Sequence, residues 1–307
     1  MRGLAREAFW RVRPSAVEPL PPSWPLEPER LKHMRIVWPT SYDWPDAQRW
    51  VGSLITGFQA HVPVSFADLP QPYDHIVVAH LELDGSRHEI AIDYGDRSEL
   101  NDDCRDRAAL YFKMQFLDEG YGTESVVPGG FPPSWPSLYG YLGRLRRTRA
   151  RQEFSTDVYG RFTAGWAAEI RSRAVRLLRE QRAFRYQGGL EVLRYSRYLS
   201  EIAQAKVCID LPGVGDLCFR LIDYLAIGSC VIGPRPSTRL HAPLTHGVNI
   251  VHCASDLSDL VPLCEHYLAQ HEERERIAQA AQAHFDRYLE KTQWATYYLR
   301  TASEQLG

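Results

Sequence analysis

An arginine and an aspartate, Arg220 and Asp223, interrupt a segment that is otherwise apolar, CFRLIDYLAIG. The segment has helical periodicity, and residues three apart lie on the same face of a helix. A charged side chain in such surroundings needs a charged partner or a ligand. The two residues either form an intrahelical pair, which contributes only about 0.3–0.5 kcal/mol, or place a guanidinium where it binds an anion. The apolar surroundings favour the second interpretation for Arg220.

The residues before this helix predict a loop that a ligand can approach closely. Pro212 ends a nearly continuous apolar run, and Gly213 and Gly215 follow it before Asp216. Glycine can take positive φ and leaves the backbone accessible, whereas aspartate is a good helix N-cap residue. In a parallel α/β sheet such a loop lies at the carboxyl edge of the strands, where ligands bind. The loop and Arg220 therefore form the first candidate site.

Two more carboxylates, Asp93 and Asp96, are three residues apart at the end of another predicted strand, residues 87–93. This position places them at the carboxyl edge of their own sheet, toward any cleft between two domains. They are either catalytic or part of a turn or helix cap. The histidines follow no metal-ligand spacing, so no metal site is expected.

Strands and helices alternate along most of the chain, which predicts an α/β fold of two Rossmann-like domains facing across a cleft. Apolar runs predict strands at residues 34–39, 75–80, 87–93, 158–162, 206–211, 229–233 and 249–253. Helical periodicity is found at residues 47–58, 165–181, 195–205, 217–228, 256–267, 272–288 and 292–304. Residues 102–115 fit either a strand or a helix. Residues 126–136 are rich in proline and glycine, which predicts a loop.

A basic run, RLRRTRAR at residues 144–151, carries five arginines in eight residues. Such a run is typical of the solvated face of a linker helix. The alternative is a positive wall that faces an anionic ligand or acceptor.

Composition limits the class of protein. A chain of 307 residues is long enough for two modest domains, and a net charge of −2 argues against a general nucleic-acid binder. No segment approaches the roughly 20 apolar residues of a transmembrane helix. The N-terminus lacks an apolar core of signal-peptide length, so a cytoplasmic location is expected. Six cysteines without a CxxC pair predict reduced thiols, and neither zinc nor disulfides.

The C-terminal half, residues 154–290, resembles the donor-binding domain of GT-B fold glycosyltransferases. The similarity is greatest to the exostosin-like and capsule-associated O-glucosyltransferase-like group. The shared features are a Tyr-rich helix before a buried strand, Gly-x-Gly-Asp, Arg220 with an acidic residue three positions later, and HGVNIVHCASDLSDL at residues 246–260. The N-terminal half is similar only through DYGDRS and YFKMQF.

This resemblance implies a hexosyl- or pentosyltransferase that moves a sugar from a nucleotide-sugar donor, with a UDP-sugar favoured, to a hydroxyl acceptor. It implies a metal-independent reaction without a cofactor, and it favours inversion over retention of configuration, which both stay open. The donor-binding residues that it implies are Gly160, Arg161, Pro212, Gly213, Gly215, Asp216, Arg220, Asp223, Ser255 and Asp256. Arg220 would also act in catalysis, and the base would be Asp93 or, as second choice, Asp96.

Two of these positions carry alternatives. Asp223 stands where the family most often has Glu, which is one methylene longer. Ser255 and Asp256 follow a predicted strand and either cap a helix or touch the donor.

The predicted division of the chain combines composition and strand pattern with this resemblance, which covers residues 154–290. We expect an extended N-terminal arm at residues 1–32, an acceptor-side domain at 33–137, a basic linker at 138–153, a nucleotide-sugar-binding domain at 154–290, and at 291–307 a helix that crosses back to the first domain.

The acceptor stays open among a glycan, a lipid-linked glycan, a protein, a small molecule and a modified nucleic acid. The alternative function is a non-catalytic module that binds a nucleotide sugar or another phosphorylated ligand. A dinucleotide-dependent enzyme is a third hypothesis, but GxGxxG is missing after the first strand.

Overall fold

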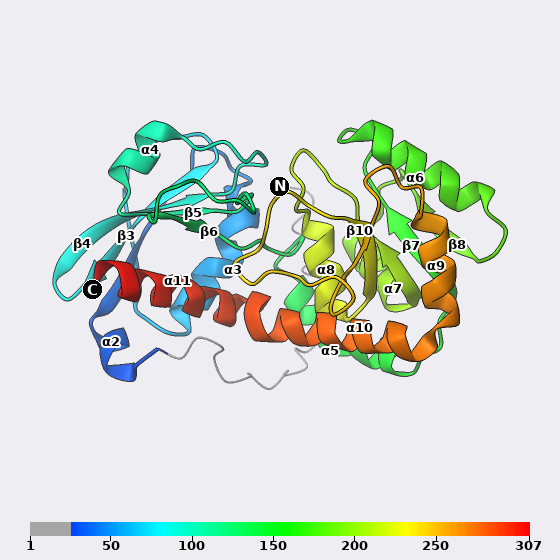
Figure 1. Cartoon of the computed structure of the whole chain (residues 1–307). Helices are drawn as coiled ribbons and strands as arrows, with labels where there is room; N and C mark the ends of the chain where they lie inside the picture. Colours follow the sequence, from blue (N-terminus) through cyan, green and yellow to red (C-terminus); the bar gives the residue numbers. More distant parts are fainter. Residues whose placement is uncertain (1–25) are drawn as a thin grey trace.

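The structure, a computed structural model, describes residues 26–307 and contains two β-sheets that stand side by side (Figure 1). The N-terminal sheet consists of β1 (Met34–Pro39), β2 (Val64–Ala67), β3 (Ile76–Leu83), β4 (Ser86–Asp93), β5 (Leu110–Lys113) and β6 (Val126–Pro128). The C-terminal sheet consists of β7 (Thr156–Arg161), β8 (Tyr186–Gly189), β9 (Ala205–Ile209), β10 (Cys230–Pro234) and β11 (Val251–Cys253). The predicted fold class, α/β with two domains, is confirmed.

The N-terminal sheet has the order β2-β1-β3-β4-β5-β6 and is mixed. Strand β3 runs antiparallel to both of its neighbours, whereas the other neighbouring pairs are parallel. The dipeptide Asp84-Gly85 joins β3 to β4, and both residues have positive φ, 50° and 82°. Positive φ at both central residues is the requirement of a tight hairpin turn. This hairpin makes the N-terminal domain depart from an all-parallel Rossmann sheet.

Two segments of this domain differ from their predictions. Residues 102–115 contain both a helix, α4 (Asp102–Arg107), and a strand, β5. Residues 126–136 begin with β6, so the predicted loop was wrong for its first three residues. Pro128 is tolerated there because β6 is an edge strand, where a missing N–H does not interrupt a ladder.

The predicted N-terminal arm lies mostly outside the described residues, which begin at residue 26. Its last part is not extended, because Pro28–Lys32 forms a short helix, α2. Pro28 stands in the first turn of that helix, where its fixed φ is compatible with helix and no N–H is needed.

All neighbouring strands of the C-terminal sheet are parallel, in the order β11-β10-β9-β7-β8. The helices of this domain are α6 (Ala168–Glu180), α7 (Tyr195–Ala203), α8 (Phe219–Ile227), α9 (Leu260–Ala269) and α10 (His271–His284). The chain adds β8 on one side of β7 and β9 on the other side. The order of strands therefore reverses between β7 and β9, and ligands of open α/β sheets bind at such a point.

Two helices connect the domains. Helix α5 (Leu138–Ala150) packs on α7 and α8, and α11 (Lys291–Leu306) runs back from α10 to the N-terminal domain (Figure 1). There α11 lies against α3 (Ala47–Gln59). Tyr298 of α11 stacks on Phe112 with ring centroids 3.8 Å apart. The chain thus passes between the domains twice.

The arginines of the basic run divide between solvent and the protein interior. Arg149 is buried and donates to the carbonyl of Ala205 at 2.7 Å. Arg146 forms a two-pronged ion pair with Asp286, at 2.6 and 3.0 Å. Two of the five guanidinium groups therefore fasten α5 to the C-terminal domain. Neither interpretation from the sequence, a solvated face or a wall that faces an anionic ligand, included this structural role.

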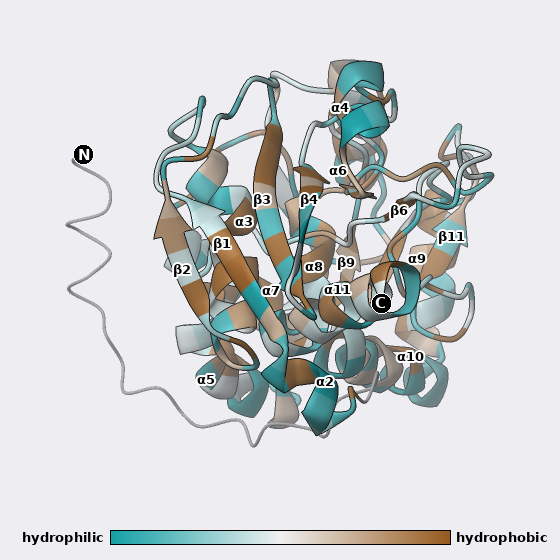
Figure 2. Cartoon of the chain, turned by 90° about the vertical axis from the view of Figure 1, so that its left-hand side faces the viewer, coloured by the Kyte–Doolittle hydropathy of each residue, from teal (hydrophilic) through white to brown (hydrophobic). Residues whose placement is uncertain are grey.

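Apolar residues predominate along the strands β1 and β3, whereas the residues of α2, α4 and α10 are mostly polar (Figure 2). The largest apolar core contains residues of both domains. Trp50 of α3 and Phe219 of α8 meet across the boundary with ring centroids 4.3 Å apart. The relative position of the two domains is therefore held by apolar packing beside the candidate site.

Candidate active site

A cavity of about 970 Å³ opens between the two domains. Its C-terminal wall consists of the segments that follow β7, β8 and β9, and its N-terminal wall of Arg49, Asp96 and residues that follow β6. We call it the interdomain cleft. It lies at the carboxyl ends of parallel strands, where the sequence predicts ligand binding.

Arg220 lies in the first turn of α8 and lines the interdomain cleft. Its Nε is 3.1 Å from Oδ1 of Asp210, its Nη2 donates to the carbonyl of Leu211 at 2.6 Å, and its guanidinium stands 4.8 Å from the ring centre of Phe162. The side chain keeps 12% of its surface exposed. Its ion-pair partner is thus Asp210 and not Asp223, so the alternative of an intrahelical pair is wrong.

Asp223 does not line the cleft. Its side chain is fully buried, and Oδ1 accepts hydrogen bonds from the backbone N–H of Ser134 at 3.1 Å and from the hydroxyl of Tyr195 at 3.0 Å. The structure therefore contradicts the predicted contact of Asp223 with a donor, because this face of α8 packs against α7 and residues that follow β6. Burial raises the pKa of Asp223 to about 7.

The raised pKa of Asp223 predicts a pH dependence of stability. The folded state holds the proton more tightly than the unfolded state, whose ordinary value is 3.8, so the free energy of unfolding falls as pH rises from 3.8 to about 7. We expect Asp223→Asn, which is neutral at every pH, to flatten the Tm profile across this window. Calorimetry at a series of pH values measures the Tm profile.

Asp256→Asn is the control. The pKa of the exposed Asp256 is lowered by its hydrogen bonds to Ser258, so removing this carboxyl cannot flatten the Tm profile between pH 3.8 and about 7. Parallel profiles for wild type and Asp223→Asn would contradict the expectation.

Residues 212–217, which we call the β9 loop, separate the interdomain cleft from a second cavity of about 310 Å³. Neither Gly213 nor Gly215 has positive φ. Gly215 is required by close approach instead, since a Cβ there would lie 2.4 Å from the carbonyl oxygen of Asp96 and 2.4 Å from the side chain of Gln115. Glycine lets the β9 loop touch the N-terminal domain.

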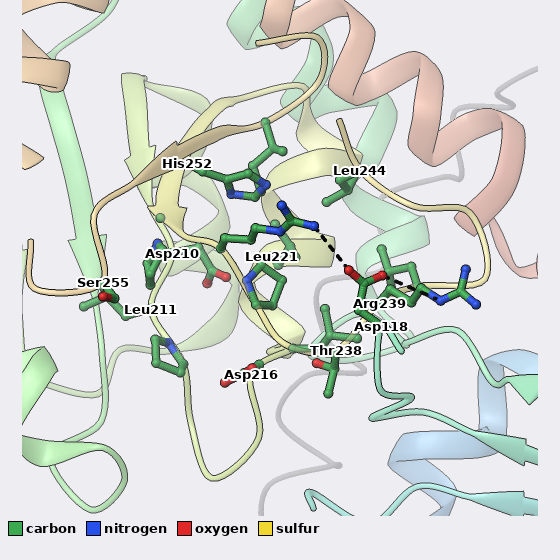
Figure 3. Close-up of a pocket in the computed structure, with 18 of the residues that line it drawn as sticks. Asp118, Asp210, Leu211, Asp216, Leu221, Thr238, Arg239, Leu244, His252 and Ser255 are labelled. Carbon is green, nitrogen blue, oxygen red and sulfur yellow. Dashed lines mark hydrogen bonds and ion pairs between the residues drawn. The ribbon is translucent and has the colours of Figure 1, made fainter. Parts of the chain in front are cut away.

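Asp216 and Ser255 line the second cavity rather than the interdomain cleft (Figure 3). Asp216 is not a helix cap, because α8 begins at Phe219 and Oδ2 of Asp216 accepts from the backbone N–H and the hydroxyl of Ser237, both at 2.6 Å. Asp256 is exposed and accepts from the N–H of Ser258 at 3.0 Å. It does not cap α9, which begins only at Leu260. The structure therefore separates these three residues from Arg220.

Gly160 and Arg161 are the last residues of β7. Gly160 pairs with Gly188 of β8, and a Cβ at Gly188 would lie 1.9 Å from the carbonyl oxygen of Gly160. Arg161 lines the cleft with its Nε 2.9 Å from a carboxylate oxygen of Glu201. Its guanidinium is thus oriented by the buried carboxylate of Glu201, which does not itself line the cleft.

Arg171 of α6 is a cleft residue that sequence reasoning missed. It is 3% exposed, its Nε donates to the carbonyl of Pro212 at 2.9 Å, and its Nη1 donates to the carbonyl and the hydroxyl of Thr163, both at 3.0 Å. Burial lowers its pKa. Helical periodicity contained a signal for it, because Arg171 shares the buried face of α6 with Ala174, Val175 and Leu178. It ties the segment after β7 to the β9 loop.

Asp93 does not fit the predicted role of base. It is 4% exposed and does not line the cleft. One carboxylate oxygen accepts from Lys113 at 2.8 Å and from the Tyr111 hydroxyl, and the other accepts from the N–H of Gly95 at 2.8 Å. The physical reason is strand pairing, since Asp93 of β4 stands directly beside Lys113 of β5.

Asp96, the second choice for the base, brings a carboxylate of the N-terminal domain to the cleft. The side chain of Asp96 is accessible from the cleft but is partly desolvated by the surrounding protein. This desolvation raises its pKa, whereas the nearby His75 and Arg49 act in the opposite direction. A carboxyl with a raised pKa is better suited to take a proton near neutral pH.

Arg49 of α3 adds a cation from the N-terminal side, and the sequence had no signal for it. Its Nε donates to the carbonyl of Ser134 at 2.7 Å, and its guanidinium lies 4.7 Å from the ring centre of Trp135 and 4.4 Å from that of Phe219. Burial lowers its pKa. Trp135 and Trp166, which are 37% and 58% exposed, add apolar surfaces to the cleft. Guanidinium groups beside aromatic rings suit a phosphorylated ligand that also has a planar or cyclic part.

Among residues 26–307 no group of three or more potential metal ligands is found. In the same part of the chain, no helix is both long enough and apolar enough to span a membrane.

A sequence profile of a family described as glycosyl transferase-like matches residues 143–300. Two solved structures of Alr3699/HepE from Anabaena also resemble the chain. The complex with UDP and glucose has 14% identity and a TM-score of 0.41, and the match covers 65% of this chain and 64% of that chain. The complex with UDP has 13% identity, a TM-score of 0.45 and coverages of 83% and 76%. The chain thus spans just under two thirds of the first of these structures. No curated protein sequence matches it significantly.

Proposed function

This chain belongs to the glycosyl transferase-like family, and we propose that it transfers a sugar from a nucleotide-sugar donor to a hydroxyl acceptor in the interdomain cleft. The observation that carries the proposal is the convergence of three groups on one cavity. The guanidinium of Arg220 and the β9 loop come from the C-terminal domain, and the carboxylate of Asp96 faces them from the N-terminal domain. The exostosin-like subgroup stays a prediction of the sequence.

The C-terminal wall of the cleft has the chemistry that a diphosphate needs. The N-terminus of α8 presents backbone N–H groups and the positive end of the helix dipole. Arg220 and Arg161 line the same wall, and guanidinium groups bind phosphate oxygens in pairs of hydrogen bonds. In this proposal Gly213, Gly215 and these two arginines bind the diphosphate, and Arg171 keeps the β9 loop in place.

The proposed reaction is a single displacement with inversion. The acceptor hydroxyl attacks the anomeric carbon, Asp96 takes the hydroxyl proton, and the bond between that carbon and the diphosphate breaks. The nucleoside diphosphate leaves with the bonding electron pair, so negative charge develops on its oxygens. Arg220 and Arg161 stabilise this negative charge. In a metal-independent reaction the protein has to supply the positive groups that do so.

A thermal-shift screen against UDP-, GDP-, ADP-, dTDP- and CMP-sugars tests the donor site. A ligand that binds only the folded state stabilises it by about 2.7 kcal/mol at a concentration of one hundred times Kd. We expect a UDP-sugar to raise the Tm by a few degrees, and the other four to have smaller effects. No shift with any of the five would contradict the proposed donor site.

The alternative, a non-catalytic binding module, makes a different prediction for the same samples. A catalytic site can also transfer the sugar to water, and the nucleoside diphosphate that this slow hydrolysis releases can be measured without knowing the acceptor. Saturable donor binding with no release of nucleoside diphosphate would favour the binding module. Release that depends on an added glycan, lipid-linked glycan, protein, small molecule or modified nucleic acid would identify the acceptor class.

A further inference from the structure

One buried amide holds the β9 loop against the N-terminal domain. Gln115 follows β5 and is 1% exposed. Its Nε2 donates to the carbonyl of Leu217 at 2.9 Å, and its Oε1 accepts from the N–H of Leu217 at 3.1 Å and from the hydroxyl of Thr238 at 3.2 Å. The side chain therefore satisfies both backbone polar groups of Leu217, as a neighbouring strand would.

The β9 loop is packed closely against the N-terminal domain at Gly215. Gly215 lies so close to Gln115 and to the backbone of Asp96 that a Cβ would come within 2.4 Å of each. Leu217 ends the loop, and Cys218 and α8 follow it directly. The conformation of the loop and the start of α8 are thus set by a residue of the opposite domain.

Neighbouring residues keep Gln115 in register with its partners. Leu117 forms an antiparallel bridge with Thr238, the N–H of Asp118 donates to the carbonyl of Ser237 at 2.9 Å, and the N–H of Arg239 donates to the carbonyl of Phe116 at 2.8 Å. Asp118 also pairs with Arg239, and Figure 3 shows both beside Thr238 at the second cavity. Residues 115–118 therefore bind the segments that follow β9 and β10 at the same time.

We propose that Gln115 is a positioning residue of the donor site, which holds the β9 loop in the conformation that binds a diphosphate. The inference rests on the proposed function, since it concerns the same site. Gln115 does not line the interdomain cleft and so acts through Leu217. Because the amide belongs to one domain and the loop to the other, donor affinity depends on the two domains being closed on each other.

Gln115→Met tests the inference, because methionine has nearly the same length and shape but cannot form these hydrogen bonds. We expect the donor KM to rise about tenfold, the net effect of two lost hydrogen bonds to the loop, and kcat to stay within about twofold. Thr238→Val removes only the hydroxyl contact, so its donor KM should rise about two- to threefold; it serves as the second variant if Gln115→Met folds poorly.

Gln71→Met is the matched control. Gln71 forms the same kind of amide pair with Val78, at 2.8 and 2.9 Å, but both residues belong to the N-terminal domain and neither lines the cleft. We expect it to lower Tm without changing the donor KM. A donor KM that is unchanged in Gln115→Met, or that rises equally in Gln71→Met, would overturn the inference.

Hydrogen exchange of the Leu217 amide gives a readout that needs no donor. It should be slow in the wild type, faster in Gln115→Met and unchanged in Gln71→Met. Unchanged exchange in Gln115→Met would overturn the holding role of Gln115 by itself. If the wild type binds no nucleotide sugar, the proposed function fails together with the donor role of Gln115. The exchange measurement still decides whether Gln115 holds the loop, so the two failures are distinguishable.

Discussion

Replacing Arg220 with Met is expected to lower kcat/KM for the donor by about a thousandfold, or ~4 kcal/mol of transition-state stabilisation. Arg220 stands at the N-terminus of α8, is only 12% exposed and is fixed by Asp210 and the carbonyl of Leu211. A guanidinium that is already oriented stabilises the leaving diphosphate without further reorganisation. Steady-state kinetics and donor titration measure the loss.

The same change leaves the carboxylate of Asp210 without its ion-pair partner, so loss of activity must be separated from loss of stability. Breaking a buried pair costs about 3–5 kcal/mol. The double variant Asp210→Asn/Arg220→Met should recover most of the stability and none of the activity. Arg149→Met is the matched control, since this guanidinium is also buried in the C-terminal domain but bonds to Ala205 away from the cleft. Normal donor affinity in a folded Arg220→Met protein would remove Arg220 from the site.

Replacing Asp96 with Asn is expected to lower transfer about a thousandfold, with donor affinity nearly unchanged, because the amide cannot accept the hydroxyl proton. The raised pKa of Asp96 adds a pH test. The base works only when ionised, so wild-type kcat/KM should fall as pH drops through a value above the ordinary 3.8 of aspartate. The residual activity of Asp96→Asn should lack this acid limb.

Asp93→Asn separates catalysis from folding in the same region. Asp93 is buried with Lys113 and Tyr111, so its neutralisation should lower the free energy of unfolding by about 3–5 kcal/mol. The part of the protein that remains folded should retain its turnover. A stable Asp93→Asn protein without transfer, together with normal transfer in Asp96→Asn, would assign the base to Asp93.

The two domains make unequal contributions to this site. The C-terminal domain supplies a parallel sheet whose carboxyl edge carries Arg161, the β9 loop and Arg220. The N-terminal domain supplies Asp96 and Arg49 to the cleft, and it also sets the shape of the β9 loop through Gln115. Proposed donor binding therefore depends on residues of both domains, although only the C-terminal half resembles a donor-binding domain.

Much of the architecture could be predicted from the sequence, because strands and helices follow from periodicities within short segments. Strand β1 occupies the predicted residues 34–39, and α3 differs from its prediction only at its last residue. The approximate place of the site was also predictable. Parallel strands bring all their carboxyl ends to one edge, so the loop before Arg220 had to lie there.

The partner of each charged or polar side chain was decided only by the tertiary structure. Arg220 pairs with Asp210 of the preceding segment, Asp93 is neutralised by Lys113 of the next strand, and Gln115 bonds to Leu217, 102 residues away. A short stretch of sequence shows which residues share one helix or strand. It does not show which residues of another helix or strand pack against them. The sequence alone therefore determined most of the elements and the sheet edge that carries the candidate site. Packing between distant segments decided which side chains face the cleft, because burial and pairing depend on neighbours that are remote along the chain.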